Sequence, residues 1–491
     1  MSSRRLILYP SKSRPLRDLL LAEGVEFPCG GDGTCGDCKI RVLQGSVPVT
    51  PAMREFLSES ELHGGWRLGC CAAASGANGE AVQVEVRQWQ TVILSDDVPL
   101  AFERREGFGA AVDLGTTTVV VQCVDLSTGE IAGSESALNE QARYGADVMS
   151  RVQHAIGYPR VLGAHIRAQI GAMLGAAAGG RALTEVLLAG NTVMHHLFCG
   201  LDVEPLAGVP FRSGALGARS FAGVELGWDD FKESAVTFLP CAGGFVGSDL
   251  LAGLLASGLA EARDAEAIFD LGTNGEIAVS DGKRIFCAST AAGPAFEGGR
   301  ISCGMRAGPG AIHRVERDGA GSRFQVIGGG TAHGICGSGL LDAVACALDA
   351  GVVFASGRIR EQERSIPLSD GLHLTQRDVR ELQLAKGAIA SGFALLKEAA
   401  GVADVKRIHL AGAFGNYVRE GSARRTGLLP QAGAAVHAAG NTALRGTRLL
   451  LLRPSSRERL LADLAARIQH VELAAEAGFQ DAFVEALPFP E

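Results

Sequence analysis

The sequence lacks the segments that mark secreted and membrane proteins. Met1-Ser-Ser-Arg-Arg5 is not followed by an apolar signal core, so secretion is not expected. The longest uncharged window, about residues 426–444, contains Pro430, several glycines, His437 and Asn441, a composition that excludes a membrane-spanning helix. We therefore expect a soluble cytoplasmic protein without a membrane partner.

The chain also lacks an excess of basic residues and has few aromatic ones. The net charge is −8, and residues 1–90 carry ten basic and ten acidic side chains, so the negative excess lies downstream. This balance argues against nucleic acid as a partner. Aromatic residues make up 5% of the chain, whereas its 66 glycines favour close-packed α/β layers. At 491 residues, of which 47% are hydrophobic, the chain should hold roughly two to four compact domains.

Four cysteines near the N-terminus have an informative spacing. Cys29, Cys35 and Cys38 lie in the glycine-rich segment Cys29-Gly-Gly-Asp-Gly-Thr-Cys35-Gly-Asp-Cys38, and Cys70 follows further along the chain. Three thiolates close together with a distant fourth is the ligand spacing of a [2Fe–2S] cluster, which glycines allow the backbone to approach. A zinc site more often shows two Cys-x2-Cys pairs, and a disulfide frame needs an oxidising compartment.

Residues 1–90 resemble the plant-type and adrenodoxin-type ferredoxins, and the five-residue gap after Cys29 is closer to the adrenodoxin-like variant. The resemblance implies a β-grasp domain with one [2Fe–2S] cluster. It favours Cys70 over the adjacent Cys71 as fourth ligand, because ferredoxins of this group commonly carry a stretch similar to Arg67-Leu-Gly-Cys70. The implied ligands are Cys29, Cys35, Cys38 and Cys70.

A strand-turn-strand pattern occurs twice downstream. After residues 91–107, which are predicted to be a linker, Asp113-Leu-Gly-Thr116 ends one apolar strand and Asp270-Leu-Gly-Thr273 ends another. A duplication at this distance predicts two related subdomains that face one another. Strands that alternate with helical stretches favour α/β layers. We expect a first lobe over residues 108–240 and a second over residues 241–491.

These turns favour a nucleotide site. Each places backbone N–H groups and hydroxyls around a concave turn that can bind phosphate oxygens, while the aspartate can hold Mg²⁺ directly or through water. Leu410-Ala-Gly-Ala-Phe-Gly415 adds a glycine turn that adenosine could approach closely. The P-loop motif Gly-x4-Gly-Lys-Ser/Thr is absent, which excludes that class. The alternative is that the glycines only close tight turns.

The repeat resembles the superfamily of acetate and sugar kinases, heat-shock ATPases and actin. The resemblance implies a duplicated two-lobed ATPase core that binds ATP and Mg²⁺. The candidate ATP-binding residues are Gly115, Thr116 and Thr117 in the first turn, Gly272, Thr273 and Asn274 in the second, and Gly412, Ala413 and Gly415 in the third. The candidate carboxylates, which would bind Mg²⁺ or position water, are Asp113, Asp147, Asp249, Asp270 and Glu276.

A ferredoxin domain joined to such a core resembles the reductive activators of corrinoid enzymes. Four further segments resemble that family: Tyr144–Arg151, Gly243–Asp249, Ile301–Ala307 and Gly334–Asp342. The resemblance implies ATP-dependent transfer of one electron from the cluster to the Co(II) corrinoid of a methyltransferase or of cobalamin-dependent methionine synthase, regenerating Co(I). An upstream low-potential reductant would supply the electron, and the chain could form a homodimer. The corrinoid should belong to the partner, because no Asp-x-His-x2-Gly pattern occurs here.

Three other functions fit part of the sequence. The runner-up is a small-molecule kinase with a ferredoxin domain as redox sensor. An activator of a radical dehydratase would hold one cluster between two subunits and lack a ferredoxin domain. A plain electron-transfer module that feeds an oxygenase would leave both Asp-Leu-Gly-Thr turns unexplained.

Overall fold

The computed structural model describes residues 2–11, 15–23, 25, 38–72, 80–88, 96–145, 147–272, 274–319, 321–369, 371–415, 417–431, 433–476 and 478–491. Three predicted site residues, Cys29, Cys35 and Thr273, lie outside these ranges. The chain divides into two compact units. The first unit is Met1–Gln90 with Leu138–Ile166, and the second unit is Thr91–Ala137 with Arg167–Glu491.

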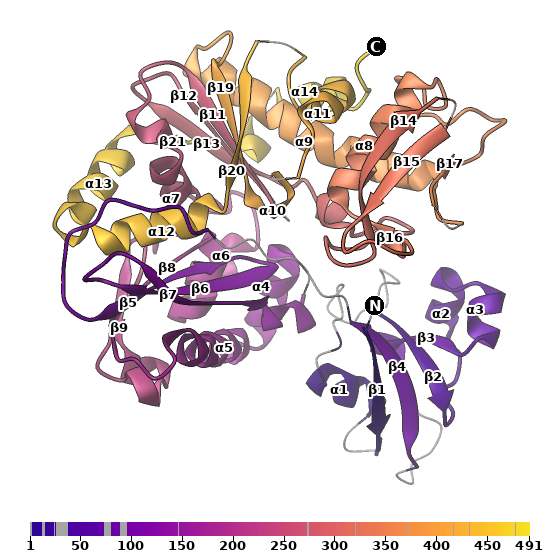
Figure 1. The fold of residues 1–491 in the computed structure, drawn as a ribbon, viewed down its shortest axis with the longest axis horizontal. Coiled ribbons are helices and arrows are strands. Elements are labelled where there is room, and N and C mark those ends of the chain that lie inside the picture. Colours follow the sequence, from indigo (N-terminus) through magenta and orange to yellow (C-terminus); the bar gives the residue numbers. More distant parts are fainter. Residues whose placement is uncertain are drawn as a thin grey trace. The chain divides into compact units, whose positions relative to one another are not determined.

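The first unit contains an antiparallel sheet with the strand order β1-β4-β2-β3 (Figure 1). Its strands are β1 (Ser2–Leu8), β2 (Lys39–Gln44), β3 (Trp66–Leu68) and β4 (Val82–Gln88), and its helices include α1 (Leu16–Ala22), α2 (Pro51–Phe56), α3 (Glu59–His63) and α4 (Val148–Gly157). Leu16 and Leu20 of α1 are fully buried in one core with Ile40 and Val84 of the sheet. A sheet that packs on one helix in this way is the arrangement expected for a β-grasp domain.

The second unit contains two six-stranded sheets. The first sheet has the order β7-β6-β5-β8-β10-β9. Its strands are β5 (Phe108–Leu114), β6 (Thr118–Asp125), β7 (Ile131–Leu138), β8 (Leu183–Gly190), β9 (Arg219–Ala222) and β10 (Ala235–Phe238). β5 pairs antiparallel with β6 on one side and parallel with β8 on the other.

The second sheet repeats this pattern in the order β20-β19-β11-β12-β13-β21. Its strands are β11 (Glu266–Leu271), β12 (Gly275–Ser280), β13 (Ile285–Thr290), β19 (Arg407–Ala411), β20 (Ala435–Gly440) and β21 (Ile468–His470). β11 pairs antiparallel with β12 and parallel with β19, as β5 does with β6 and β8. The register matches too, since Asp113 lies opposite Ala189 and Asp270 lies opposite Ala411. The repeat seen in the sequence is therefore a repeat of topology.

Two helices, α7 (Ser248–Ala256) and α12 (Thr442–Leu452), pack against one another between the two sheets (Figure 1). Their backbones approach closely, because a Cβ atom at Gly446 would lie 2.0 Å from the carbonyl oxygen of Ala252. The other α-helices of the described residues are α5 (Val161–Ala178), α6 (Thr192–Cys199), α8 (Gly337–Asp349), α9 (Gln376–Ala400), α10 (Gly412–Gly415), α11 (Glu420–Thr426), α13 (Pro454–Arg467) and α14 (Phe479–Ala486). Two small sheets contain β14 (Ala311–Asp318), β15 (Gly321–Val326), β16 (Gly334–Ile335), β17 (Ile366–Pro367) and β18 (His373–Leu374).

The described part of the predicted linker is anchored to the second unit. Asp96 is buried, with 5% of its surface exposed. Its carboxylate accepts hydrogen bonds from Arg445 Nε, at 2.8 Å, and from the guanidinium of Arg448, at 3.3 Å. Its carbonyl oxygen accepts one from Gln122 Nε2 of β6, at 2.7 Å. Residues 96–107 are thus tied both to the first sheet and to α12.

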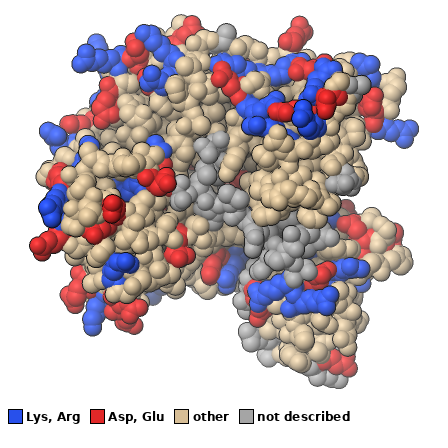
Figure 2. Space-filling model, viewed as in Figure 1, with Lys and Arg blue, Asp and Glu red and all other residues tan. Residues whose placement is uncertain are grey.

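Acidic and basic side chains lie close together over the outer part of the second unit. Figure 2 shows Lys and Arg side by side with Asp and Glu in the region of α8, β14 and β15. The ion pairs there include Arg419 with Glu316, at 2.9 Å, and Arg425 with Asp349, at 2.6 Å. None of the helices in the described ranges is long and apolar enough to cross a lipid bilayer.

Candidate functional site

Two of the predicted cluster ligands lie together in the first unit. Cys38 precedes β2, and Cys70 lies in a short 3₁₀ turn (Gly69–Cys71) that follows β3. Both thiols are buried, their sulfurs are 3.2 Å apart, and the backbone N–H of Cys70 donates to Cys38 Sγ at 3.4 Å. Cys71 Sγ is 3.6 Å from Cys70 Sγ and is less buried. Paired thiols that receive a backbone N–H fit the predicted iron–sulfur ligand set.

Arg67 holds in place the backbone segment that leads to Cys70. Its guanidinium donates from Nε to the carbonyl oxygen of Val47, at 2.7 Å, and from Nη1 to that of Leu62, at 2.9 Å. The backbone N–H of Gly69 donates to the carbonyl oxygen of Cys38, at 2.7 Å. These bonds hold the cysteine-bearing turn against the start of β2.

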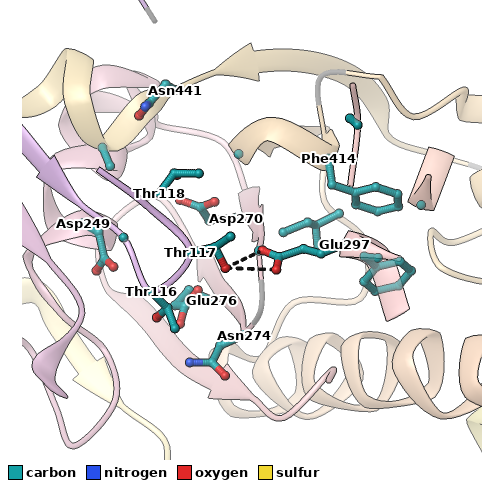
Figure 3. Close-up of a pocket in the computed structure, with 18 of the residues that line it drawn as sticks. Thr116, Thr117, Thr118, Asp249, Asp270, Asn274, Glu276, Glu297, Phe414 and Asn441 are labelled. Carbon is teal, nitrogen blue, oxygen red and sulfur yellow. Dashed lines mark hydrogen bonds between the residues drawn. The ribbon is translucent and has the colours of Figure 1, made fainter. Parts of the chain in front are cut away.

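A cavity lies in the second unit at the carboxyl ends of β5, β8 and β11, where open α/β sheets commonly bind ligands. Figure 3 shows its residues drawn from both six-stranded sheets. Predicted residues that line it are Asp113, Gly115, Thr116, Thr117, Asp249, Asp270, Gly272, Asn274, Glu276 and Gly412. Gly412 begins α10, the helical turn that also contains Ala413 and Gly415. The two predicted turns therefore face one cavity.

The β5–β6 turn is tight and is held from two sides. The backbone N–H of Gly115 donates to the carbonyl oxygen of Thr118 at 2.9 Å, and a Cβ atom at Gly115 would lie 2.9 Å from that oxygen. Asn191 Nδ2 donates to Thr116 Oγ1 at 2.8 Å. Thr117 Oγ1 donates to both oxygens of Glu297, at 3.0 and 3.1 Å, across the cavity (Figure 3). The predicted first phosphate turn is thus presented to the cavity in a fixed shape.

Five carboxyl groups line the cavity, those of Asp113, Asp249, Asp270, Glu276 and Glu297, whereas its described lining includes a single basic side chain, Arg306. Burial raises the pKa of Asp113 to about 6, against the opposing effect of a hydrogen bond from Asn441. Burial and the charge of Asp113 raise the pKa of Asp270 to about 7. Burial and the neighbouring aspartates raise the pKa of Asp249 to about 8 and that of Glu276 well above its ordinary value. Carboxylates that outnumber the basic side chains around a cavity suit a bound cation.

The carboxylates do not form a preformed cage. Within the described ranges, no three His, Cys, Asp or Glu side chains are close enough to ligate one metal ion together. Asp270 and Glu276 are partners on neighbouring strands, and Asp249 lies in the first turn of α7. Mg²⁺ retains several waters and takes only one or two carboxylates plus substrate phosphates, so this arrangement fits Mg²⁺ better than Ca²⁺.

The wall formed by α8, α10 and their neighbours is partly apolar. The rings of Phe296 and Phe414 stack with centroids 4.5 Å apart, and both line the cavity. Gly337 and Ser338, in the first turn of α8, line it as well, and helix N-termini attract anions. An apolar wall beside N–H groups and carboxylates suits a ligand with a flat base and a polyphosphate chain.

Sequence reasoning missed several residues that line this cavity, among them Asn441, Phe296 and Glu297. A signal existed for Asn441, because Gly440-Asn441-Thr442 repeats Gly190-Asn191-Thr192. Two of the family-like segments supply lining residues whose roles the sequence left open, Arg306, Ala307, Cys336, Gly337 and Ser338, and a third supplies the predicted Asp249. Phe296 and Glu297 lie in no such pattern.

The remaining predicted carboxylate, Asp147, lies in the first unit. It caps α4, where its Oδ1 accepts a hydrogen bond from the backbone N–H of Ser150 at 2.8 Å. A role for Asp147 in binding Mg²⁺ stays a prediction.

Family comparisons cover nearly the whole chain. Residues 9–75 match the 2Fe-2S iron-sulfur cluster binding domain, residues 108–262 match the RACo middle region, and residues 264–491 match the C-terminal domain of RACo, the ASKHA domain. The first match confirms the predicted [2Fe–2S] domain. The predicted first lobe, residues 108–240, falls within the match to the RACo middle region.

Individual proteins agree with this assignment. The corrinoid activation enzyme RamQ of Eubacterium limosum is 34% identical over 429 residues, which cover 79% of this chain and 71% of that protein. The [Co(II) methylated amine-specific corrinoid protein] reductase of Methanosarcina barkeri is 28% identical over 421 residues, which cover 78% and 77% of the two chains.

A solved structure is similar over nearly its full length. The reductive activator for corrinoid,iron-sulfur protein superposes with a TM-score of 0.70 at 26% identity, covering 99% of this chain and 97% of that one. Together these findings confirm the predicted fold class, a β-grasp ferredoxin domain followed by a duplicated ATPase core. This chain belongs to the family of reductive activators of corrinoid enzymes.

Proposed function

We propose that this chain is an ATP-dependent reductive activator that passes one electron from its [2Fe–2S] cluster to the Co(II) corrinoid of a partner protein, which returns to Co(I). The observation that carries the proposal is that one chain holds both the buried thiol pair Cys38 and Cys70 and a carboxylate-lined cavity in a duplicated core. The kinase alternative is not favoured, because two relatives that match most of the chain are named as enzymes that activate or reduce corrinoid proteins.

The first unit would supply the electron carrier. Cys38 and Cys70 would hold the cluster together with Cys29 and Cys35, which the sequence predicts as the other ligands. A [2Fe–2S] cluster supplies one-electron exchange at low potential when bound. Arg67 keeps the turn before Cys70 in place, and an upstream low-potential reductant would recharge the domain after each transfer.

The second unit would bind Mg-ATP. The β5–β6 turn and the first turn of α8 offer hydroxyl and N–H groups to phosphates, while Phe296 and Phe414 offer an apolar wall to the adenine. Asp113, Asp249 and Asp270 would hold Mg²⁺ largely through its waters, and the ion would offset the repulsion among them.

ATP is needed because reduction of Co(II) corrinoids lies at very low potential. Plant-type clusters have reduction potentials of about −400 mV. Each ~59 mV by which the potential of the cluster lies above that of the Co(II) corrinoid lowers the equilibrium constant for one-electron transfer about tenfold. A nucleotide can offset a shortfall only by binding two conformations with different affinity. The cavity draws residues from both sheets, and Asn441 beside β20 donates to Asp113 of β5 at 2.8 Å. A ligand there is expected to change how the two sheets sit together, and through this the docking of the partner.

An anaerobic optical assay tests the proposal. Chemically reduced protein is mixed with a Co(II) corrinoid protein, with and without Mg-ATP, and the Co(I) band is followed. A methyltransferase corrinoid protein and a methionine synthase cobalamin domain serve as two clients. Asp270→Ala should abolish the ATP-dependent part, whereas Asp318→Asn, at an exposed position, should not. Full ATP-dependent activity in Asp270→Ala would refute the role of the cavity. No Co(I) with either client, despite an intact cluster and bound ATP, would favour the kinase.

A further inference from the structure

Two asparagines of the second unit each lie between a strand and the helix that follows it. Gly190-Asn191-Thr192 ends β8 and begins α6, and Gly440-Asn441-Thr442 ends β20 and begins α12. Asn191 and Asn441 are the N-cap residues of those helices. Both side chains line the cavity; Asn191 reaches Thr116 in the β5–β6 turn, and Asn441 reaches Asp113 near the end of β5. Two amides from different strand ends therefore meet the same strand and turn.

The helix caps fix which way each amide points. Asn191 Oδ1 accepts the backbone N–H of Met194 at 3.0 Å, and Asn441 Oδ1 accepts that of Leu444 at 2.9 Å. A backbone N–H can only donate, so the amide oxygen must face the helix and the NH₂ group must face away from it. The NH₂ groups meet Thr116 Oγ1 and Asp113 Oδ2, both at 2.8 Å.

For Thr116 this orientation decides the direction of its hydroxyl proton. The hydroxyl accepts from Asn191, a side chain with only 5% of its surface exposed. Its single proton is then left for another acceptor, and Thr116 lines the cavity. An anionic oxygen in the cavity would find a donor there instead of a lone pair.

For Asp113 the same geometry fixes the orientation of the carboxylate. Its Oδ2 accepts a hydrogen bond from Asn441 Nδ2 at 2.8 Å. A carboxylate held in this way keeps its orientation for a cation. One asparagine thus sets a donor for phosphate, and the other sets an acceptor for Mg²⁺ or its waters.

We propose that Asn191 and Asn441 are positioning residues that set the hydrogen-bond polarity of the nucleotide cavity, Asn191 through the Thr116 hydroxyl and Asn441 through the Asp113 carboxylate. The inference rests on the proposed function, because it takes a Mg²⁺–polyphosphate as the ligand. It deepens that function by naming which groups make Thr116 a donor to a phosphate oxygen and Asp113 an acceptor.

The test uses Asn191→Asp, because aspartate is as good an N-cap as asparagine but cannot donate when ionised. Thr116 would then donate to the new carboxylate and present lone pairs to the ligand. Calorimetric titration of the full chain with Mg-ATP at pH 8.5 should show binding weakened roughly ten- to hundredfold, the size of a lost hydrogen bond to a charged group.

A double-mutant cycle with Thr116→Val separates this role from a structural one. If Asn191 acts through Thr116, Asn191→Asp should add little to the loss that Thr116→Val causes alone. Asn191→Ser keeps a cap but cannot reach Thr116, and it should weaken binding less than Asn191→Asp at pH 8.5. Asn441→Ser should weaken Mg-ATP binding while its helix cap is retained.

Two results would overturn the proposal: additive losses in the cycle, or a loss for Asn191→Asp no larger than that for Asn191→Ser. Failure of the wild-type chain to bind Mg-ATP would instead refute the proposed function.

Discussion

Asp96→Asn removes a negative charge from one of the most enclosed ion pairs of the second unit. Asp96 and Arg448 have 5% and 1% of their surface exposed, and Arg445 contacts the same carboxylate. The substitution keeps the shape of the side chain but removes the buried anion between two arginines, and the nearest acid that remains, Asp97, is exposed. These contacts join the described start of the predicted linker to β6 and α12, so their loss should destabilise the second unit.

The expected magnitude follows from the partners that remain. Removing one partner of a buried ion pair costs about 3–5 kcal/mol, because the other charge is left uncompensated. Arg448 retains hydrogen bonds to Gln122 Oε1, at 2.8 Å, and to the carbonyl oxygens of residues 96 and 98, which places the loss at about 3 kcal/mol. Removing both partners is often near neutral, so Asp96→Asn combined with Arg448→Met should cost less than the sum of the single changes.

Urea unfolding followed by the fluorescence of Trp228, a buried side chain of the second unit, measures the effect. Trp66→Phe and Trp89→Phe in the background remove the other two tryptophans. Asp318→Asn is the matched control, because the Asp318–Arg323 pair is exposed and 3.9 Å long, and it should cost under about 0.5 kcal/mol. A loss for Asp96→Asn no larger than that of the control would refute the reasoning.

Two further predictions concern the site. Mg-ATP binding should tighten as the pH rises from about 6 to about 8, because the raised pKa values of the cavity aspartates, about 6, 7 and 8, mean that protons must leave before a cation binds. The fold without a bound cation retains those protons, so its free energy of unfolding should fall over the same rise in pH. Calorimetric titration across the range measures the affinity for Mg-ATP, and an affinity that stayed constant would contradict the prediction. With Asp249→Asn, the affinity should reach its plateau at a lower pH. Cys70→Ser should abolish the visible absorbance of the cluster, whereas Cys71→Ser should retain it; loss in the Cys71 variant alone would make Cys71 the ligand.

Much of the site could be predicted because its signals are local. The pairs Asp113 with Gly115 and Asp270 with Gly272 each belong to a single strand and the turn that follows it, and turn chemistry is written in adjacent residues. Asn441 carried a local signal as well, in the second Gly-Asn-Thr segment, but its partner in β5 lies in a distant part of the sequence.

Other parts of the site had no local signal. Glu297 meets Thr117 because a short 3₁₀ turn after β13 reaches across the cavity, and nothing in the residues around Glu297 predicts that contact. The predicted linker showed charge and proline at the level of sequence. Only the structure revealed that Asp96 is buried against two arginines of α12.

The sequence by itself determined the ligand spacing of the iron–sulfur domain and the duplicated Asp-Leu-Gly-Thr turns, because a metal-binding loop and a phosphate turn each need particular residues at fixed short separations. Tertiary structure decided which carboxylates converge. Asp249 joins Asp113 and Asp270 in one cavity, and their pKa values rise, only because α7 and two sheets far apart in sequence pack together and exclude water from the space between them.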